Sequence, residues 1–189
     1  MSSHHIVREK QEPALLLLSL DNFSDELLGQ LLEWSPTVIT NPQVAEQLDS
    51  VEIKIDIIIA DKIDQNLQSD IKQIYPAGTS PLHAALNYLI KNEYKAVNIV
   101  ADEIDIEELT VFVPQINIVI YSADKKIYAI NPGFSKWKPA GESIRILSLY
   151  LNLQTSGLAD SGDENFTTVA DGFFSIDFDG GFLFIAEDV

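Results

Sequence analysis

The sequence contains no cysteine, and this absence excludes several classes of protein. A chain without cysteine cannot build a disulfide scaffold, a thiolate zinc site or a thiol nucleophile. Of its three histidines, His4 and His5 lie in an N-terminal segment without hydrophobic periodicity, which leaves only His83 in the body of the chain. A histidine-rich metal site is therefore unsupported, and any chemistry must rest on carboxylates.

Positive charge and long apolar runs are also scarce. Twelve Lys and Arg stand against 29 Asp and Glu, which gives a net charge of −17 and does not suit binding to nucleic acid or to an anionic membrane surface. The densest apolar run, Leu15 to Leu18, is far shorter than the roughly 20 residues that span a bilayer, and no signal-peptide pattern precedes it. We expect a cytoplasmic protein with neither nucleic acid nor membrane among its partners.

Short apolar runs alternate with amphipathic segments over the first 122 residues. Residues 1–13 lack periodicity and are expected to form a flexible arm or an edge extension. Strands are predicted at 14–20, 37–40, 53–60, 96–100 and 116–121. Helices are predicted at 24–34, 42–48, 81–90 and 105–112. This alternation predicts an α/β domain over 14–122 with a doubly wound, Rossmann-like parallel sheet.

The pattern changes after residue 122. Strand-like runs at 126–130, 143–151, 173–178 and 182–185 are separated by turns rich in Pro and Gly, which predicts a small antiparallel β-sandwich over 123–189. A domain of roughly 65 residues is small for independent stability. It also carries more aromatic surface than we expect it to bury alone, in Phe166, Phe173, Phe174, Phe178, Phe182 and Phe184. We therefore expect a homodimer.

Candidate site residues follow from the parallel sheet, because ligands in such sheets lie beyond the carboxyl ends of the strands. Asp61 and Asp64 follow the third strand and could hold a hydrated Mg²⁺, although two carboxylates in a strand-end loop of so acidic a chain are more often solvated or cap a helix. Trp137, between Lys136 and Lys138, could receive a flat or phosphorylated ligand, or could belong to an amphipathic strand at a sheet edge. Neither a Walker loop nor a G-x-G-x-x-G motif occurs.

Taken together, the whole pattern resembles thiamine pyrophosphokinase. The segment 55–64 (IDIIIADKID) aligns with the Ile-Asp-(apolar)₃-Gly-Asp-Phe-Asp-Ser motif in which that family ends an early strand. In the β domain the family carries a Thr-x-Gly-Leu turn followed by a Ser-Asn. The first resembles Thr155, Ser156, Gly157 and Leu158, and the second resembles the region of Asn165. The resemblance implies ATP and Mg²⁺ at the first domain and thiamine bound with the help of these β-domain residues.

The sequence departs from the family where phosphate and metal would bind. Asp61 is retained, but the second aspartate of the motif falls on Ile63, which cannot ligate a hard cation. The Asp-Gln-x-x-Thr-Asp stretch aligns with 77–82 (AGTSPL), which has no carboxylate. An Arg-Asp-His segment has become 101–105 (ADEID), which repels a triphosphate, and an Asp-Gly-Ala has become 41–43 (NPQ).

These departures lead to a first hypothesis and two alternatives. The first is a catalytically degenerate, thiamine pyrophosphokinase-like protein that binds thiamine, a related small molecule or a regulatory partner. The second is an active thiamine pyrophosphokinase that transfers pyrophosphate from ATP, in which Asp61, Asp64, Asp102 and the β domain hold Mg²⁺ and thiamine in a shifted arrangement. The third is a protein-interaction module without a small-molecule ligand.

Overall fold

A computed structural model describes residues 12–62 and 67–189, and it divides the chain into two compact units. The first unit ends at Ile118 and the second begins at Val119. Within the described ranges, no helix is both long and apolar enough to cross a membrane. The two units differ in architecture, and each is described separately below.

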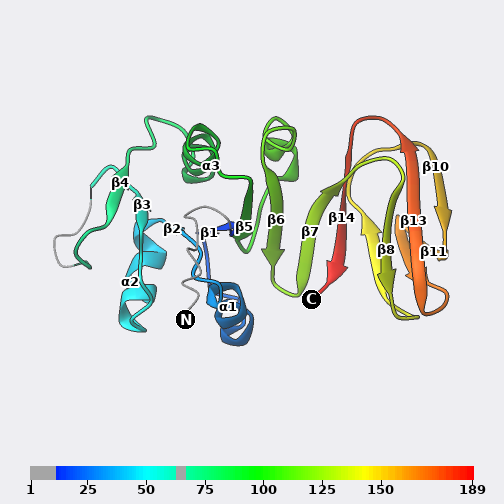
Figure 1. The fold of residues 1–189 in the computed structure, drawn as a ribbon, viewed down its shortest axis with the longest axis horizontal. Coiled ribbons are helices and arrows are strands. Elements are labelled where there is room, and N and C mark those ends of the chain that lie inside the picture. The colour runs from blue at the N-terminus through cyan, green and yellow to red at the C-terminus, as the bar shows by residue number, and fades with distance from the viewer. Residues whose placement is uncertain (1–11, 63–66) are drawn as a thin grey trace, which may run out of the picture. The chain divides into compact units, whose positions relative to one another are not determined.

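The first unit is built on a sheet of parallel strands (Figure 1). Its strands are β1 (Ala14–Leu17), β2 (Val38–Thr40), β3 (Ile57–Ile59), β4 (Lys72–Ile74) and β5 (Ala96–Val100). They lie side by side in the order β5-β1-β2-β3-β4. Every residue of β1, β2 and β3 is buried, as the continuous apolar runs of the sequence predict for a parallel sheet covered on both faces.

Three helices connect these strands, and a polar side chain caps each at its N-terminus. They are α1 (Asp25–Leu32), α2 (Pro42–Ser50) and α3 (Pro81–Lys91). Ser24, Asn41 and Ser80 accept hydrogen bonds from backbone N–H groups of the first turns at 3.1, 3.0 and 3.2 Å. These contacts satisfy N–H groups that a helix start otherwise leaves without partners.

The order of the strands reverses once. The chain runs outward from β1 through β2 and β3 to β4, and then returns through α3 to β5 on the other side of β1. Since parallel strands are joined by right-handed connections, this reversal places α1 and α2 on one face of the sheet and α3 on the other. The predicted mixed α/β architecture is confirmed, and the switch point of the sheet lies between β1 and β5.

In this unit two local predictions are wrong and one strand was missed. The strand predicted at 53–60 is confined to Ile57–Ile59, because the side-chain amide of Gln68 pairs with backbone groups of Ile53 and Ile55 at 2.7 and 3.0 Å. The helix predicted at 105–112 is only a short 3₁₀ turn, η1 (Ile106–Leu109). Strand β4 was not predicted, because an edge strand needs no apolar alternation.

The second unit is antiparallel. Its strands are β6 (Asn117–Ser122), which begins in the first unit, β7 (Lys125–Ile130), β8 (Phe134–Lys138), β9 (Ser143–Ile146), β10 (Leu151–Ser156), β11 (Leu158–Gly162), β12 (Asn165–Thr168), β13 (Gly172–Asp179) and β14 (Leu183–Asp188). One layer has the order β11-β12-β9-β14-β7-β6, and the other is the separate sheet β10-β13-β8. The predicted strand at 143–151 is therefore divided into β9 and β10, and β8, β11 and β12 had not been predicted.

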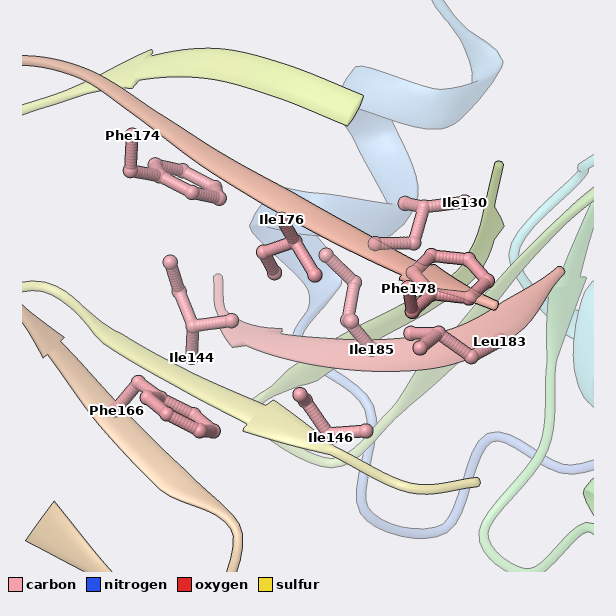
Figure 2. Close-up of a cluster of buried hydrophobic side chains, with 9 residues drawn as sticks. All are labelled: Ile130, Ile144, Ile146, Phe166, Phe174, Ile176, Phe178, Leu183 and Ile185. Atoms are coloured by element: carbon pink, nitrogen blue, oxygen red, sulfur yellow. The ribbon is translucent and has the colours of Figure 1, made fainter. Parts of the chain in front are cut away.

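Apolar side chains from both layers form the core of the second unit, and Figure 2 shows nine of them packed together. They include Phe166, Phe174 and Phe178, and Phe184 is also buried within the single chain. Phe173 is 73% exposed. Four of the six phenylalanines are therefore buried without a second copy of the chain, contrary to the expectation, and the homodimer itself stays a prediction.

Candidate functional site

The carboxyl ends of β1 and β5, at the switch point, hold a polar cluster in the first unit. Asp102, just beyond β5, accepts hydrogen bonds from the Ser19 hydroxyl and from the Asn22 side-chain amide, the latter at 3.3 Å. Ser19 and Asn22 both follow β1. We call Ser19, Asn22 and Asp102 the carboxyl-edge cluster. Because its members come from the two strands that flank the switch point, it lies where α/β sheets bind ligands.

Asn41 fixes the loop that carries Ser19. Its side-chain amide donates to the Leu18 carbonyl at 2.8 Å, while its carbonyl oxygen accepts from the Val44 N–H at the start of α2. Thr40, which is fully buried, donates its hydroxyl hydrogen to the Leu17 carbonyl at 2.9 Å. The loop after β1 is thus tied to the neighbouring strand and helix, and the position of Ser19 is set by the fold.

The charge at this edge of the sheet is negative. The segments that follow the strands, 18–22, 40–41, 60–62 and 101–105, carry the carboxylates Asp21, Asp61, Asp102, Glu103 and Asp105 and a single cation, Lys62. Asp105 accepts the Glu107 N–H at 2.9 Å and so caps η1. Asp61 and Glu103 are exposed. Such an edge repels a polyphosphate and attracts a cation.

The described residues do not fit the magnesium ion that the resemblance implies. Among residues 12–62 and 67–189, no group of three or more His, Cys, Asp or Glu is placed to hold a metal ion. Asp61 is exposed beyond β3, and Asp102 is already bonded to Ser19 and Asn22. Asp64 and Ile63 lie outside the described residues, so the predicted pairing of Asp61 with Asp64 stays a prediction.

The β-domain residues that the sequence singles out lie where β10 passes into β11. Thr155 and Ser156 are exposed at the end of β10, and Leu158 packs against the core from β11. Gly157, between them, has φ of +72°, and a Cβ there would stand 2.9 Å from the Phe173 carbonyl oxygen. Glycine is therefore required at this position by its backbone conformation and by the approach of β13.

Asn165 has a local structural role in the described contacts. Its side-chain amide donates to the carbonyl oxygens of Gly162 and Asp163, at 3.3 and 3.0 Å, and closes the turn between β11 and β12. Binding of thiamine by Asn165 and by residues 155–158 remains a prediction.

Trp137 and its two lysines do not form a common site. Trp137 is 53% exposed on β8, while Lys136 and Lys138 each donate to the buried carboxylate of Glu187, at 2.7 and 2.8 Å. Successive side chains of a strand point to opposite faces, so the lysines lie on the face away from the indole. This segment is therefore an amphipathic strand at the edge of its sheet, which is the alternative that the sequence analysis gave for it.

Ser19 and Asn22 had not been singled out as candidates. The sequence placed Ser19 inside a strand over 14–20, whereas β1 ends at Leu17. The available signal was the change from apolar to polar residues after Leu18, which marks the carboxyl end of the strand.

The fold of this chain occurs in solved structures of other proteins. The sequence matches no protein-family model and no curated protein. Its fold is nevertheless shared with solved structures of thiamine pyrophosphokinases. Thiamin pyrophosphokinase from Geobacillus thermodenitrificans superimposes with a TM-score of 0.71 at 8% identity, covering 93% of this chain and 97% of that one.

Two further solved structures have the same fold as this chain. Thiamine pyrophosphokinase from Bacillus subtilis gives a TM-score of 0.66 at 13% identity, with 94% of this chain and 99% of that one covered. A crystal structure of a protein from Lactobacillus plantarum gives 0.72 at 12% identity, with 94% and 99% covered. This chain therefore has the thiamine pyrophosphokinase fold, and the resemblance seen in the sequence is confirmed at the level of the fold.

Proposed function

We propose that this protein is a catalytically degenerate member of the thiamine pyrophosphokinase fold that binds thiamine or a related small cation without transferring pyrophosphate. The observation that supports this proposal most is the carboxyl-edge cluster, in which the Asp102 carboxylate is held at the switch point among further carboxylates. Thiamine carries a permanent positive charge on its thiazolium ring. A negatively charged edge therefore suits thiamine and disfavours ATP.

The loss of pyrophosphoryl transfer follows from the needs of that reaction. Its catalysis consists mostly of positioning and of neutralising the charge on the phosphates, for which metal ions and cations are the minimum equipment. The segment 101–105 presents three acids and no cation, and 77–82 has no carboxylate to hold a metal. The loss of contacts of this kind typically costs several kcal/mol of transition-state stabilisation, and about 1.4 kcal/mol corresponds to a tenfold change in rate.

Isothermal titration calorimetry with thiamine tests the binding proposal. The unmodified protein should bind thiamine, and Asp102→Asn should weaken binding roughly tenfold, the effect of losing one charged contact. Asp49→Asn is the matched control, because Asp49 is an exposed aspartate of α2 outside the carboxyl-edge cluster and its replacement should leave the affinity unchanged. Equal loss in both variants, or no binding of thiamine by the unmodified protein, would contradict the proposal.

A thermal-shift comparison separates the three hypotheses, since a ligand that binds only the folded state raises the melting temperature. Stabilisation by thiamine alone supports the degenerate binder. Stabilisation by ATP with Mg²⁺, together with formation of thiamine diphosphate, would establish the active enzyme instead. Stabilisation by neither would favour the protein-interaction module.

The activity itself is tested by incubation with thiamine, ATP and Mg²⁺, followed by chromatography of the products. We expect no thiamine diphosphate above background. Ile63→Asp alone should not restore turnover, because the acids at 101–105 would still repel the triphosphate. Robust turnover by the unmodified protein would refute the degenerate reading.

A further inference from the structure

The first unit has a concave region at the opposite edge of its sheet from the carboxyl-edge cluster. A cavity of about 660 Å³ lies where the parallel strands begin. Its lining includes Thr37 just before β2, Asp56 just before β3 and Lys72 at the first position of β4. A volume of this size is ordinary for a small-molecule site, for which roughly 300–1,000 Å³ is typical. None of these residues belongs to the site proposed above.

Aromatic rings form part of the cavity lining. Trp34, which follows α1, lies in the lining with its side chain 69% exposed. Tyr94 lies in the lining from the segment before β5, and its hydroxyl is 3.0 Å from the Thr37 hydroxyl. Tyr88 lines the cavity from α3. The exposed indole, in a lining that also holds two tyrosines, offers a surface on which a flat ring can stack.

Of the two lysines in the described lining, Lys72 is the one without a carboxylate partner among the described residues. Its ammonium group donates to the Tyr88 hydroxyl at 2.9 Å and lies 4.5 Å from the centre of the Tyr88 ring. Within residues 12–62 and 67–189, Lys72 takes part in no salt bridge. An ammonium has three donors, and a neutral phenol leaves its charge without a counter-ion. Lys72 is therefore placed to receive an anionic group.

The other charges of the lining limit that group to a single negative charge. Lys54 is already paired with Asp56 at 2.6 Å, and the second oxygen of Asp56 accepts the Val38 N–H at 3.0 Å. Glu12 also lines the cavity and opposes further negative charge. With Lys54 and Asp56 paired to each other, the described lining offers an anion the ammonium of Lys72 and opposes it with the carboxylate of Glu12, which suits a monoanion better than a phosphate dianion.

We propose that this amino-edge cavity binds a flat aromatic molecule that carries one carboxylate, with the ring against Trp34 and the carboxylate on the ammonium of Lys72. The proposal does not depend on the function proposed for the carboxyl edge, because it uses none of the same residues. The alternative is that Lys72 only protects the exposed strand β4 from pairing with other chains, as lysines on edge strands often do.

Nuclear magnetic resonance of the two tryptophan indoles tests the proposal. The chain has two tryptophans, Trp34 and Trp137, and the Trp34→Phe variant assigns their ¹H–¹⁵N indole signals. Titration with 2-naphthoate should shift the Trp34 signal in a saturable way and leave the Trp137 signal in place. The uncharged 2-naphthol, ringless acetate and the dianion 2-naphthyl phosphate should each bind more weakly than 2-naphthoate.

Variants at Lys72 establish the role of its charge. Lys72→Gln should weaken 2-naphthoate binding roughly tenfold, the effect of one charge-assisted hydrogen bond, whereas Lys72→Arg should retain it. Lys91→Gln is the matched control, since Lys91 is an exposed lysine of α3 outside the cavity lining. The spectrum of each variant also reports whether it is folded.

Four results would overturn the proposal. They are an unmoved Trp34 signal, equal shifts of Trp34 and Trp137, equal binding of 2-naphthol and 2-naphthoate, and unchanged binding by a folded Lys72→Gln variant. Tighter binding of 2-naphthyl phosphate than of 2-naphthoate would refute the assignment to a monoanion.

Discussion

Glu187 offers the sharpest test of what holds the second unit together. It lies on β14, is 3% exposed, and accepts hydrogen bonds from three side chains of the same unit. Lys136 contacts both of its oxygens, at 2.7 and 2.8 Å, and Lys138 donates at 2.8 Å. The Tyr128 hydroxyl is the third donor. Glu187→Gln keeps the shape of the side chain and removes the charge that both lysines face.

The expected cost is about 3 kcal/mol of the free energy of unfolding. Removing one partner of a buried ion pair typically costs about 3–5 kcal/mol, because a charge is left inside without compensation. The lower end applies here, since the side chain of Lys136 is 34% exposed and Lys138 keeps a second partner in Glu142 at 3.1 Å. Water and Glu142 therefore compensate part of the loss.

Urea unfolding followed by Trp137 fluorescence measures this cost. The Trp34→Phe background restricts the signal to the second unit, because Trp34 and Trp137 are the two tryptophans of the chain. Asp188→Asn is the control: Asp188 is the next residue of β14, and its pair with Lys125 is about half exposed on both sides. Such surface pairs are worth up to about 1 kcal/mol. Equal, small effects of both substitutions would refute the assignment of a buried ionic core.

The effect of Glu187→Gln on the free energy of unfolding should depend on pH. Burial by itself raises the pKa of Glu187, but the hydrogen bonds from Lys136, Lys138 and Tyr128 outweigh it and hold the pKa below the ordinary value of 4.5. A carboxyl with a lowered pKa in the folded state stabilises the fold above its unfolded pKa and loses that contribution as the pH falls through its folded pKa. The difference in stability between the unmodified protein and Glu187→Gln should therefore be largest above about pH 5 and shrink toward about pH 3. A constant difference over this range would contradict the argument.

Three further predictions concern local structure and assembly. Gly157→Ala should lower the free energy of unfolding by about 2 kcal/mol in urea titration, because alanine is strained at φ of +72° and its Cβ would lie 2.9 Å from the Phe173 oxygen; an unchanged midpoint would contradict this. Asn41→Ala should lower the melting temperature, because it removes both the cap of α2 and the hydrogen bond to the Leu18 carbonyl, a loss of about 1–2 kcal/mol in the free energy of unfolding. Asn41→Asp should lose less, because its carboxylate keeps the cap and only the hydrogen bond to Leu18 is lost. Light scattering should report a dimer, and a 21.0 kDa particle would refute this expectation.

Much of the first unit could be predicted from the order of its residues. Apolar runs such as Leu15–Leu17 and 57–59 mark strands buried on both faces, and Ser24 and Ser80 mark the starts of two helices. These signals are local, because hydrophobic periodicity and capping act over a few neighbouring residues. Local signals failed where contacts were not local, as in segment 53–56, where Gln68 takes the backbone partners that a strand would use.

The candidate sites depended on the tertiary structure. Ser19 and Asp102 are 83 positions apart and meet because the strand order reverses between β1 and β5. Trp34 and Lys72 share a cavity because α1 and β4 both place residues at the amino edge of the sheet.

The sequence by itself determined the mixed α/β class, the negative charge and the resemblance to thiamine pyrophosphokinase, because composition, periodicity and motif spacing are properties of the chain. The tertiary structure alone decided which polar residues meet. It separated Trp137 from Lys136 and Lys138 across one strand, and it brought both lysines to Glu187. Such pairings arise from strand order and register, which link residues far apart in the chain and leave no local pattern in the sequence.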